Sequence, residues 1–270
     1  MILTNDNYYS PEANQKFISV SQFKDFVGTY GQPACEAHAL AKIKGEWEDE
    51  MTTALLVGSF VDAFFDGTLE QFKAKHPDIF TKGSKNIPST LKAPYKQAEL
   101  IIERILKDKK FCQYMSGEKQ TIMTADLFGV PWKIKIDSYH ENVCIVDLKV
   151  MQSIYDHKWV KDIGYVEFIR YWGYDIQGAV YQKIVEINTG KQLPFYIAAV
   201  TKSDHPQMRL IQIPQIWLDD ALSVVKAYLP RIVRIKKGEI EPDRCEQCDY
   251  CNDTYVIDKP IMATDLNGAI

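Results

Sequence analysis

The sequence predicts an α/β fold in which a mixed central sheet is flanked by helices. Two changes in the hydrophobic period support this prediction. Apolar residues recur at helical spacing up to about residue 115, alternate with polar residues from 118 to 149, and then return to helical spacing. Two short apolar runs and a final helical stretch follow. Strands joined by short turns pair in antiparallel fashion, whereas strands separated by a helix can pair in parallel. A sheet built from both kinds is therefore expected to be mixed.

The first part of the chain is predicted to be helical. Ser19 is a candidate N-cap for the first of these helices. Residues 51–67 are almost entirely apolar, which indicates a buried helix, and Asp62 is an exception that needs a reason. Residues 68–95 predict a polar loop, and 95–115 a further helix.

Residues 118–149 predict three short antiparallel strands. In the second strand the apolar side chains alternate with Lys133, Lys135 and Asp137, which are therefore expected to share the opposite face.

The remaining elements are expected to complete the sheet and cover it. A helix predicted over 171–190 ends at Gly190, a residue suited to a helix C-cap. Residues 193–202 and 208–214 predict two more strands, and 216–236 a long helix.

Composition limits the classes of function. The chain has 270 residues, a net charge of −4 and a pI of about 5.8, so bulk positive charge is not how it would hold a nucleic acid. A local groove and bound cations would have to supply the positive potential. No apolar run is long enough for a membrane span, and the N-terminus lacks a signal-peptide pattern, so we expect a cytoplasmic protein that does not bind membranes.

An acidic residue and a lysine lie two positions apart in the predicted strand CIVDLKV. Asp147 and Lys149 therefore point to the same face, and Asp137 reaches that face if the two strands form a hairpin. Two carboxylates and the backbone carbonyl of Leu148 are oxygen ligands of the kind that Mg²⁺ or Mn²⁺ prefers. Lys149 would then orient a water molecule or help to deprotonate it. An isolated D-x-K, however, is more often an ordinary pair on an exposed strand.

Four runs of residues make the catalytic interpretation stronger. They are, in order, GSFVDAFFDG, GVPWKIKIDSY, CIVDLKV and YDIQGAVYQ. Their order and spacing resemble the RecB-type branch of the PD-(D/E)xK nucleases. Within that branch the chain is most similar to phage and prophage exonucleases that resemble the nuclease domain of RecE, exodeoxyribonuclease VIII. The resemblance extends from Ser19 to about Thr254.

The resemblance implies roles for five residues. Asp137 matches the second motif of the family, and Asp147 with Lys149 matches the third. Gln177 and Tyr181 match the family's Q-x-x-x-Y motif, which helps to position DNA or the active-site lysine. A spacing of four on a helix places both side chains on one face.

Two further carboxylates are candidate metal ligands. Asp62 lies four residues after a glycine, where the family usually has a histidine that assists metal binding, so its role as a ligand is a departure from the pattern. Glu118, at the start of the first predicted strand, is either a ligand or a solvated residue at a strand end.

Cys245, Cys248 and Cys251 have a C-x-x-C-x-x-C spacing that is compact enough for one metal site. Cys35 is the candidate fourth ligand, because some RecB-type nucleases hold a [4Fe-4S] cluster with one upstream and three C-terminal cysteines. The spacing of the last two cysteines is shorter here than in those clusters. A structural Zn²⁺ and uncoordinated thiols therefore stay open as alternatives.

The resemblance also implies function and partners. We expect an Mg²⁺-dependent exonuclease that resects linear double-stranded DNA for phage-type recombination and passes single strands to a RecT-like annealing protein. Homo-oligomers occur in this family. The whole chain, 1–270, is expected to be one nuclease domain, with N-terminal helices over 19–66, a catalytic core over 116–236 and a Cys-rich segment over 245–251.

Other functions remain compatible with the sequence. The same metal site would serve an endonuclease or a single-strand nuclease, since the site determines phosphodiester cleavage and not the shape of the substrate. A catalytically silent DNA-binding module is the alternative outside enzymes.

Overall fold

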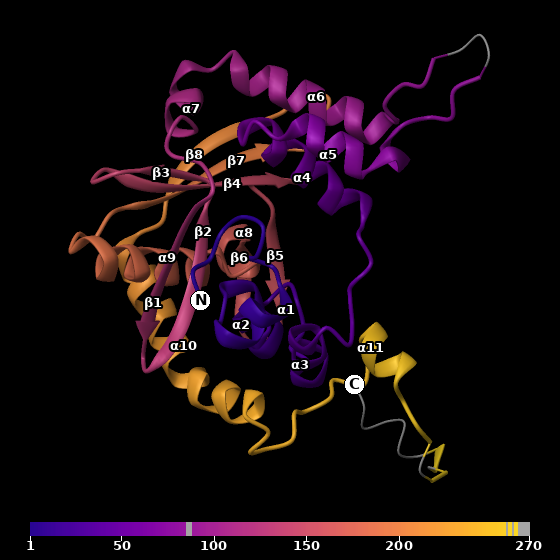
Figure 1. Ribbon diagram of the computed structural model, residues 1–270, viewed down its shortest axis with the longest axis vertical. Coiled ribbons are helices and arrows are strands. Elements are labelled where there is room, and N and C mark those ends of the chain that lie inside the picture. The colour runs from indigo at the N-terminus through magenta and orange to yellow at the C-terminus, as the bar shows by residue number, and fades with distance from the viewer. Residues whose placement is uncertain (85–87, 258, 261, 264–270) are drawn as a thin grey trace.

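A four-stranded mixed sheet lies at the centre of the protein (Figure 1). The structure is a computed structural model, and it describes residues 1–84, 88–257, 259–260 and 262–263. The strands, in their order across the sheet, are β3 (Ser138–His140), β4 (Cys144–Met151), β7 (Phe195–Thr201) and β8 (Met208–Gln212). The β4–β7 pair is parallel and the two outer pairs are antiparallel, which confirms the predicted mixed sheet.

Helices cover both faces of this sheet, as Figure 1 shows. One face packs against α4 (Thr53–Phe65), α6 (Ala93–Leu106) and α7 (Lys109–Tyr114), and the other against α9 (Tyr174–Thr189) and α10 (Gln215–Lys236). Each layer has its own apolar core, and β4 contributes to both because its side chains alternate. Val146 and Leu148 belong to the α4 side, whereas Ile145 belongs to the α9 side.

The predicted three-stranded meander is instead two hairpins in different sheets. β1 (Thr121–Leu127) pairs with β2 (Val130–Ile136) in a two-stranded sheet, and β3 pairs with β4 in the central one. The chain changes sheets at Asp137, between β2 and β3. A third hairpin, β5 (His157–Val160) with β6 (Gly164–Glu167), was not predicted.

The N-terminal part is helical, as predicted, and packs below the sheet in Figure 1. It contains α1 (Pro11–Lys16), α2 (Val20–Val27) and α3 (Glu36–Lys44). Ser19 is the N-cap of α2 and forms a capping box with Gln22. The remaining short helices are α5 (Leu69–Lys75), η1 (Pro77–Ile79), α8 (Phe168–Tyr171) and α11 (Asp249–Asp253).

Two predicted segments differ in detail from the structure. The helix expected over 95–115 is divided, because Asp108 N-caps α7 by accepting a hydrogen bond from the backbone N–H of Phe111 at 2.9 Å. The loop expected over 68–95 contains α5 and η1. Within the described residues, no helix has both the length and the apolar character that crossing a membrane requires.

A glycine allows α9 to lie close to the sheet. A Cβ atom on Gly178 would be 2.8 Å from the Phe195 ring on β7 and 2.9 Å from Leu218 on α10. The absence of a side chain at this position lets the helix approach β7 at van der Waals distance. This packing brings the neighbouring Gln177 against the sheet.

Candidate active site and cysteine cluster

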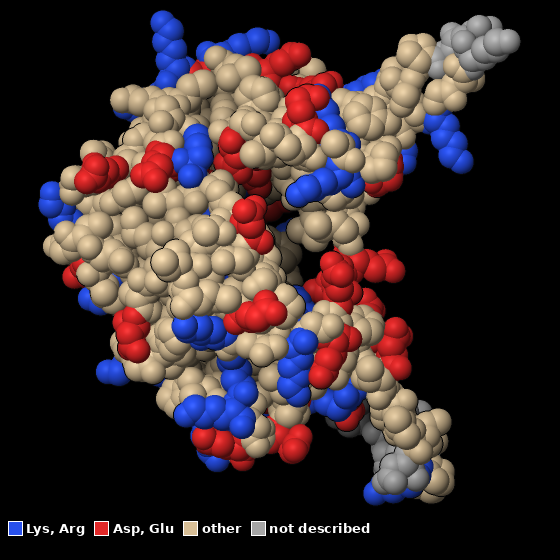
Figure 2. Space-filling view, in the orientation of Figure 1, with Lys and Arg blue, Asp and Glu red and all other residues tan. Residues whose placement is uncertain are grey.

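A cleft of about 1390 Å³ opens between the helices of the two layers. In Figure 2 it is the dark hollow between the part that carries α4 and the part that carries α2 and α3, with acidic and basic side chains on its rim. Seven of the predicted site residues line it: Asp62, Asp137, Asp147, Leu148, Lys149, Gln177 and Tyr181. The structure therefore brings together residues that are up to 119 positions apart in sequence (181 − 62).

Asp137 reaches the cleft because it stands at the break between β2 and β3. Its Oδ2 accepts a hydrogen bond from the backbone N–H of Leu148 at 2.9 Å. The N–H and C=O of one strand residue point to the same edge, so the Leu148 carbonyl lies on the side of Asp137. Burial, and then the charges of Asp147 and Asp62, raise the pKa of Asp137 well above its ordinary value.

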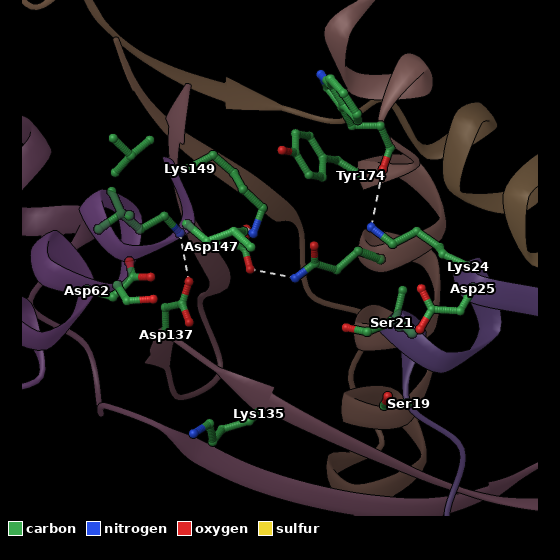
Figure 3. A pocket seen from close by; sticks show the side chains of 18 of the residues that line it. Ser19, Ser21, Lys24, Asp25, Asp62, Lys135, Asp137, Asp147, Lys149 and Tyr174 are labelled. Carbon is green, nitrogen blue, oxygen red and sulfur yellow. Dashed lines mark hydrogen bonds and ion pairs between the residues drawn. The ribbon is translucent and has the colours of Figure 1, made fainter. Parts of the chain in front are cut away.

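Asp147 is the most enclosed carboxylate of the cleft, with a side chain and backbone that are together 3% exposed. Gln177 on α9 donates from Nε2 to Asp147 Oδ1 at 2.6 Å, and the Lys149 ammonium forms an ion pair with Oδ2. Figure 3 shows Asp147 and Lys149 between Asp62 and Asp137 on one side and Lys24 on the other. Apart from the ion pair, Oδ2 has no hydrogen-bond donor among the described residues.

The cleft shifts the pKa values of two of its lysines in opposite directions. Burial by itself lowers the pKa of Lys149, but the charges of Asp147 and Asp137 outweigh burial and raise that pKa above its ordinary value. For Lys24 on α2, burial and then the charge of Lys149 lower the pKa to about 8. Lys149 is thus held as a cation, whereas Lys24 titrates near neutral pH.

Asp62 projects from α4 toward Asp137 (Figure 3). Burial raises its pKa to about 7, and the charge of Asp147 adds to that effect. Asp66, one turn further along α4, also lines the cleft, and it was not predicted. Burial raises the pKa of Asp66 too, although a hydrogen bond from Gln120 and the charge of Lys119 oppose this effect.

Tyr181 contacts the backbone of β2, next to the site. Its hydroxyl donates to the backbone carbonyl of Lys135 at 3.1 Å, and burial raises its pKa well above the ordinary value. The Q-x-x-x-Y residues therefore act on different strands, because Gln177 holds Asp147 on β4 and Tyr181 holds β2.

Glu118 is not brought into the cleft. Its backbone N–H and C=O pair with Tyr139 of β3 at 2.8 and 2.9 Å, which fixes it at the edge of the central sheet. It is not among the residues that line the cleft, and the carboxylates whose charges act on Asp137 are Asp147 of β4 and Asp62 of α4.

Only some of the other polar residues of the cleft could be predicted from the sequence. Lys135 was predicted to share a face with Asp137, and it does line the cleft. Lys133, predicted on the same face, is 1% exposed. Lys24 and Asp66 lie on helices whose hydrophobic patterns carry no information about a cleft, so no local signal could have found them.

A second cluster lies away from the carboxylates. The Sγ atoms of Cys35, Cys245, Cys248 and Cys251 all lie within 4.8 Å of one another. Cys35 precedes α3 and Cys251 lies in α11, and their Sγ atoms are 3.5 Å apart. The predicted fourth cysteine is therefore beside the other three.

Ion pairs hold the two segments of this cluster together. Arg231 of α10 contacts Glu36 at 2.5 Å and Asp243 at 2.7 Å, and the backbone N–H of Ala37 donates to the carbonyl of Asp243. Burial raises the pKa of Cys245, but N–H donors of Gln247 and Cys248 outweigh burial and bring it to about 7. A thiolate, the form that binds metals, is therefore accessible near neutral pH.

Comparisons with known proteins agree with the geometry. Residues 19–254 match a family described as the PDDEXK-like domain of unknown function (DUF3799). The chain belongs to this family. The PD-(D/E)xK prediction made from the four sequence runs is thereby confirmed, and with it the restriction-endonuclease-like fold class.

One solved structure is very similar to this chain. The chain is 57% identical to a protein named a putative exonuclease from Eubacterium rectale, with all of both chains covered and a TM-score of 0.95. A second structure, SSO0001, is 14% identical, and the match covers 83% of this chain and 93% of that chain. Its TM-score of 0.28 is too low to support a conclusion about fold or function. No curated protein matches the chain. These findings support the predicted enzyme class, a nuclease.

Proposed function

We propose that this nuclease hydrolyses phosphodiester bonds of DNA with Mg²⁺ or Mn²⁺ and digests linear double-stranded DNA from its ends. The observation that carries the proposal is the convergence of Asp137, Asp147 and Lys149 with Gln177 in one cleft. The name of the Eubacterium rectale relative supports digestion from ends.

The donor set of the cleft fits a hard divalent cation. Asp62, Asp137 and Asp147 supply carboxylate oxygens, and the Leu148 carbonyl lies at the same edge. Apart from the Lys149 ammonium, no donor among the described residues contacts Asp147 Oδ2, so this oxygen is available to a cation. Carboxylates and a backbone carbonyl are ligands that Mg²⁺ and Mn²⁺ prefer, and open positions would be filled by water and substrate oxygens. When bound, such a cation stabilises charge on the phosphoryl oxygens and makes its water more acidic.

The side chains of this chain perform the remaining tasks. Gln177 fixes the orientation of Asp147 through Oδ1, which leaves Oδ2 facing the cleft. The Lys149 ammonium stays charged beside Asp147, so it orients the attacking water and offsets charge on the phosphate. The water oxygen bonds to phosphorus and gives one proton to solvent, the bond from phosphorus to the leaving oxygen breaks, and that oxygen takes a proton from solvent or a neighbouring acid. Lys24, whose pKa is lowered to about 8, also lines the cleft and would contact the substrate phosphate.

The cellular role rests on the family resemblance. We propose that the single strand left by digestion is passed to a RecT-like annealing protein during phage-type recombination. A homo-oligomer that surrounds DNA would keep the enzyme on its substrate.

For the cysteine cluster we propose one tetrahedral ion, Zn²⁺, with a [4Fe-4S] cluster as the alternative. A Zn–S bond of about 2.3 Å places tetrahedral sulfur atoms about 3.8 Å apart. The Sγ atoms of Cys35 and Cys245 lie 3.5 and 3.9 Å from that of Cys251, which fits a single ion. Such a site would be structural, because four thiolates leave no position for water. A broad visible absorption of anaerobically purified protein would indicate the cluster, and zinc in metal analysis the ion.

One experiment tests the catalytic proposal. Linear and covalently closed circular duplexes are incubated with the protein and Mg²⁺, and separately with a chelator. The Asp147→Ala variant is the test variant, and Asp220→Ala, which changes an exposed aspartate of α10, is the matched control. We expect the protein to digest the linear DNA and not the circular DNA, and only when Mg²⁺ is present. Asp147→Ala should lose this activity, and Asp220→Ala should retain it.

Other outcomes would replace the proposal. Cleavage of the circular duplex would indicate an endonuclease. Digestion of only single-stranded DNA would indicate a single-strand nuclease. DNA binding without cleavage would indicate a silent binding module.

A further inference from the structure

The N-terminal segment, defined here as residues 1–17, forms part of the cleft although it precedes the family match at residue 19. Tyr8, Tyr9, Pro11 and Asn14 are all lining residues. No motif described above assigns a role to this segment. It is largely irregular before α1, so contacts with the rest of the protein must determine its position.

A buried lysine fixes the segment in place. Lys133 of β2 is 1% exposed, and its ammonium donates to the Tyr8 carbonyl and to Asn14 Oδ1, the latter at 2.7 Å. The same ammonium lies 4.6 Å from the centre of the Tyr8 ring. A second lysine, Lys236 of α10, donates to the Asn14 carbonyl at 3.2 Å. Burying an ammonium is unfavourable unless acceptors surround it, and here the N-terminal segment supplies the acceptors.

This anchoring leaves one of the two tyrosine rings of the segment exposed. Tyr8 is buried, whereas the adjacent Tyr9 is 68% exposed and lines the cleft. Tyr9 is held by an edge contact with the Tyr8 ring at 4.9 Å and by the Lys135 ammonium at 4.6 Å from its ring centre. Lys135 is also close enough to the α4 carboxylates to lower the pKa of Asp62 and Asp66.

We propose that the N-terminal segment is part of the nucleic-acid site and that Tyr9 stacks on an unpaired base of the strand that is cut. An exposed ring beside a lysine is the arrangement that single-strand binding surfaces use, with the ring contacting a base and the ammonium a phosphate. Trp172, which is 43% exposed and lines the same cleft, offers a second ring. The substrate strand therefore enters the cleft unpaired. This inference rests on the proposed nuclease function and specifies the form of its substrate.

The test compares a long and a small substrate. The long one is an oligonucleotide with 2-aminopurine near its end, whose fluorescence decreases when the base stacks. The small one is a p-nitrophenyl ester of thymidine monophosphate, which requires only the metal site. The variants are Tyr9→Ala, Tyr9→Phe, and Tyr255→Ala as a matched tyrosine control that is 61% exposed and outside the cleft lining.

We expect Tyr9→Ala to raise KM for the oligonucleotide by about tenfold, the usual effect of losing one stacking ring, while kcat for the small ester stays unchanged. Quenching of 2-aminopurine should be lost in Tyr9→Ala and retained in Tyr9→Phe and Tyr255→Ala. Lys133→Met, which releases the segment, should reproduce the KM effect. All variants are first compared by thermal unfolding, and Tyr9→Ala decides the question if Lys133→Met does not fold.

Two results would overturn the inference. If Tyr9→Ala retains the wild-type KM and quenching while the wild type cleaves both substrates, the nuclease function stands and the stacking role is wrong. If the wild type cleaves neither substrate, the proposed function itself is wrong and the inference fails with it.

Discussion

The carboxylate cleft and the cysteine cluster are two candidate cation sites built in opposite ways. The three central residues of the cleft, Asp137, Asp147 and Lys149, lie within 13 residues of one another in sequence (137–149), and the cleft is open to solvent and substrate. The cysteine cluster joins Cys35 to Cys251 across 216 positions, and both of these cysteines are buried. Hard oxygen donors with open positions suit catalysis, whereas four enclosed thiolates suit a structural metal.

The difference shows how the fold positions each set of ligands. A sheet holds its residues at a fixed register, so the cleft can keep its geometry while its carboxylates repel one another. The cysteines lie at the start of one short helix, in another short helix and in an irregular segment, so a bound metal would contribute directly to holding these parts together. Removing a cation should therefore affect activity at the first site and stability at the second.

The largest expected effect is at Asp147. Asp147→Asn keeps the size of the side chain and its contact with Gln177 but removes the negative charge from the centre of the cleft. We expect DNA cleavage to decrease by about a thousandfold or more, because the cation and Lys149 both depend on that charge. The thermal midpoint should not fall. A variant that keeps more than a tenth of the wild-type rate would contradict a catalytic role.

The cysteine cluster should respond mainly in stability. Cys35→Ser is expected to lower the thermal midpoint by about 5–10 °C and to make the segment after α10 sensitive to protease, since the metal would join that segment to α3. Initial cleavage rates below the unfolding transition should change little. Cys144→Ser is the control, because Cys144 is buried in the core of the α4 layer. Equal shifts in both variants would argue against a metal at the cluster.

A smaller kinetic effect is expected at the Q-x-x-x-Y helix. Gln177→Leu removes the 2.6 Å hydrogen bond to Asp147. We expect kcat to decrease by about 10- to 100-fold, which is the usual effect of removing a group that orients a metal ligand. Tyr181→Phe should have a weaker effect, because its hydroxyl reaches the backbone of Lys135 and no catalytic side chain. Steady-state kinetics at saturating Mg²⁺ would show this order, and a reversed order would contradict it.

The smallest effect concerns Asp62 and pH. Burial raises its pKa from 3.8 to about 7, so between these values the folded protein retains a proton that the unfolded chain has lost. The contribution of this group to stability therefore decreases as pH rises through that window. In chelator at pH 8, Asp62→Asn should raise the thermal midpoint by about 2–4 °C, and the difference should shrink at pH 5. Saturating Mg²⁺ should stabilise the wild type more than the variant, and an equal shift would indicate that Asp62 is not a ligand.

The local parts of the cleft could be predicted from the sequence. The two-residue spacing of Asp147 and Lys149 specifies one face of a strand, and the four-residue spacing of Gln177 and Tyr181 specifies one face of a helix. Cys35 was identified only through the family resemblance, because nothing in its local sequence points to cysteines more than 200 positions away. Glu118 shows the limit of this reasoning, since its position near a strand end was compatible with the cleft until its pairing with Tyr139 was known.

The sequence by itself determined the mixed α/β fold class, the shared strand face of Asp147 and Lys149, and the compact spacing of Cys245, Cys248 and Cys251. Hydrophobic period and residue spacing encode those features within a few turns or strand residues. Only the tertiary structure decided that β2 and β3 lie in different sheets with Asp137 at the break, that Lys24 and Asp66 line the cleft, and that a buried Lys133 anchors the N-terminal segment beside it through Tyr8 and Asn14. These features depend on how separate elements pack, because packing brings residues together that local patterns cannot relate.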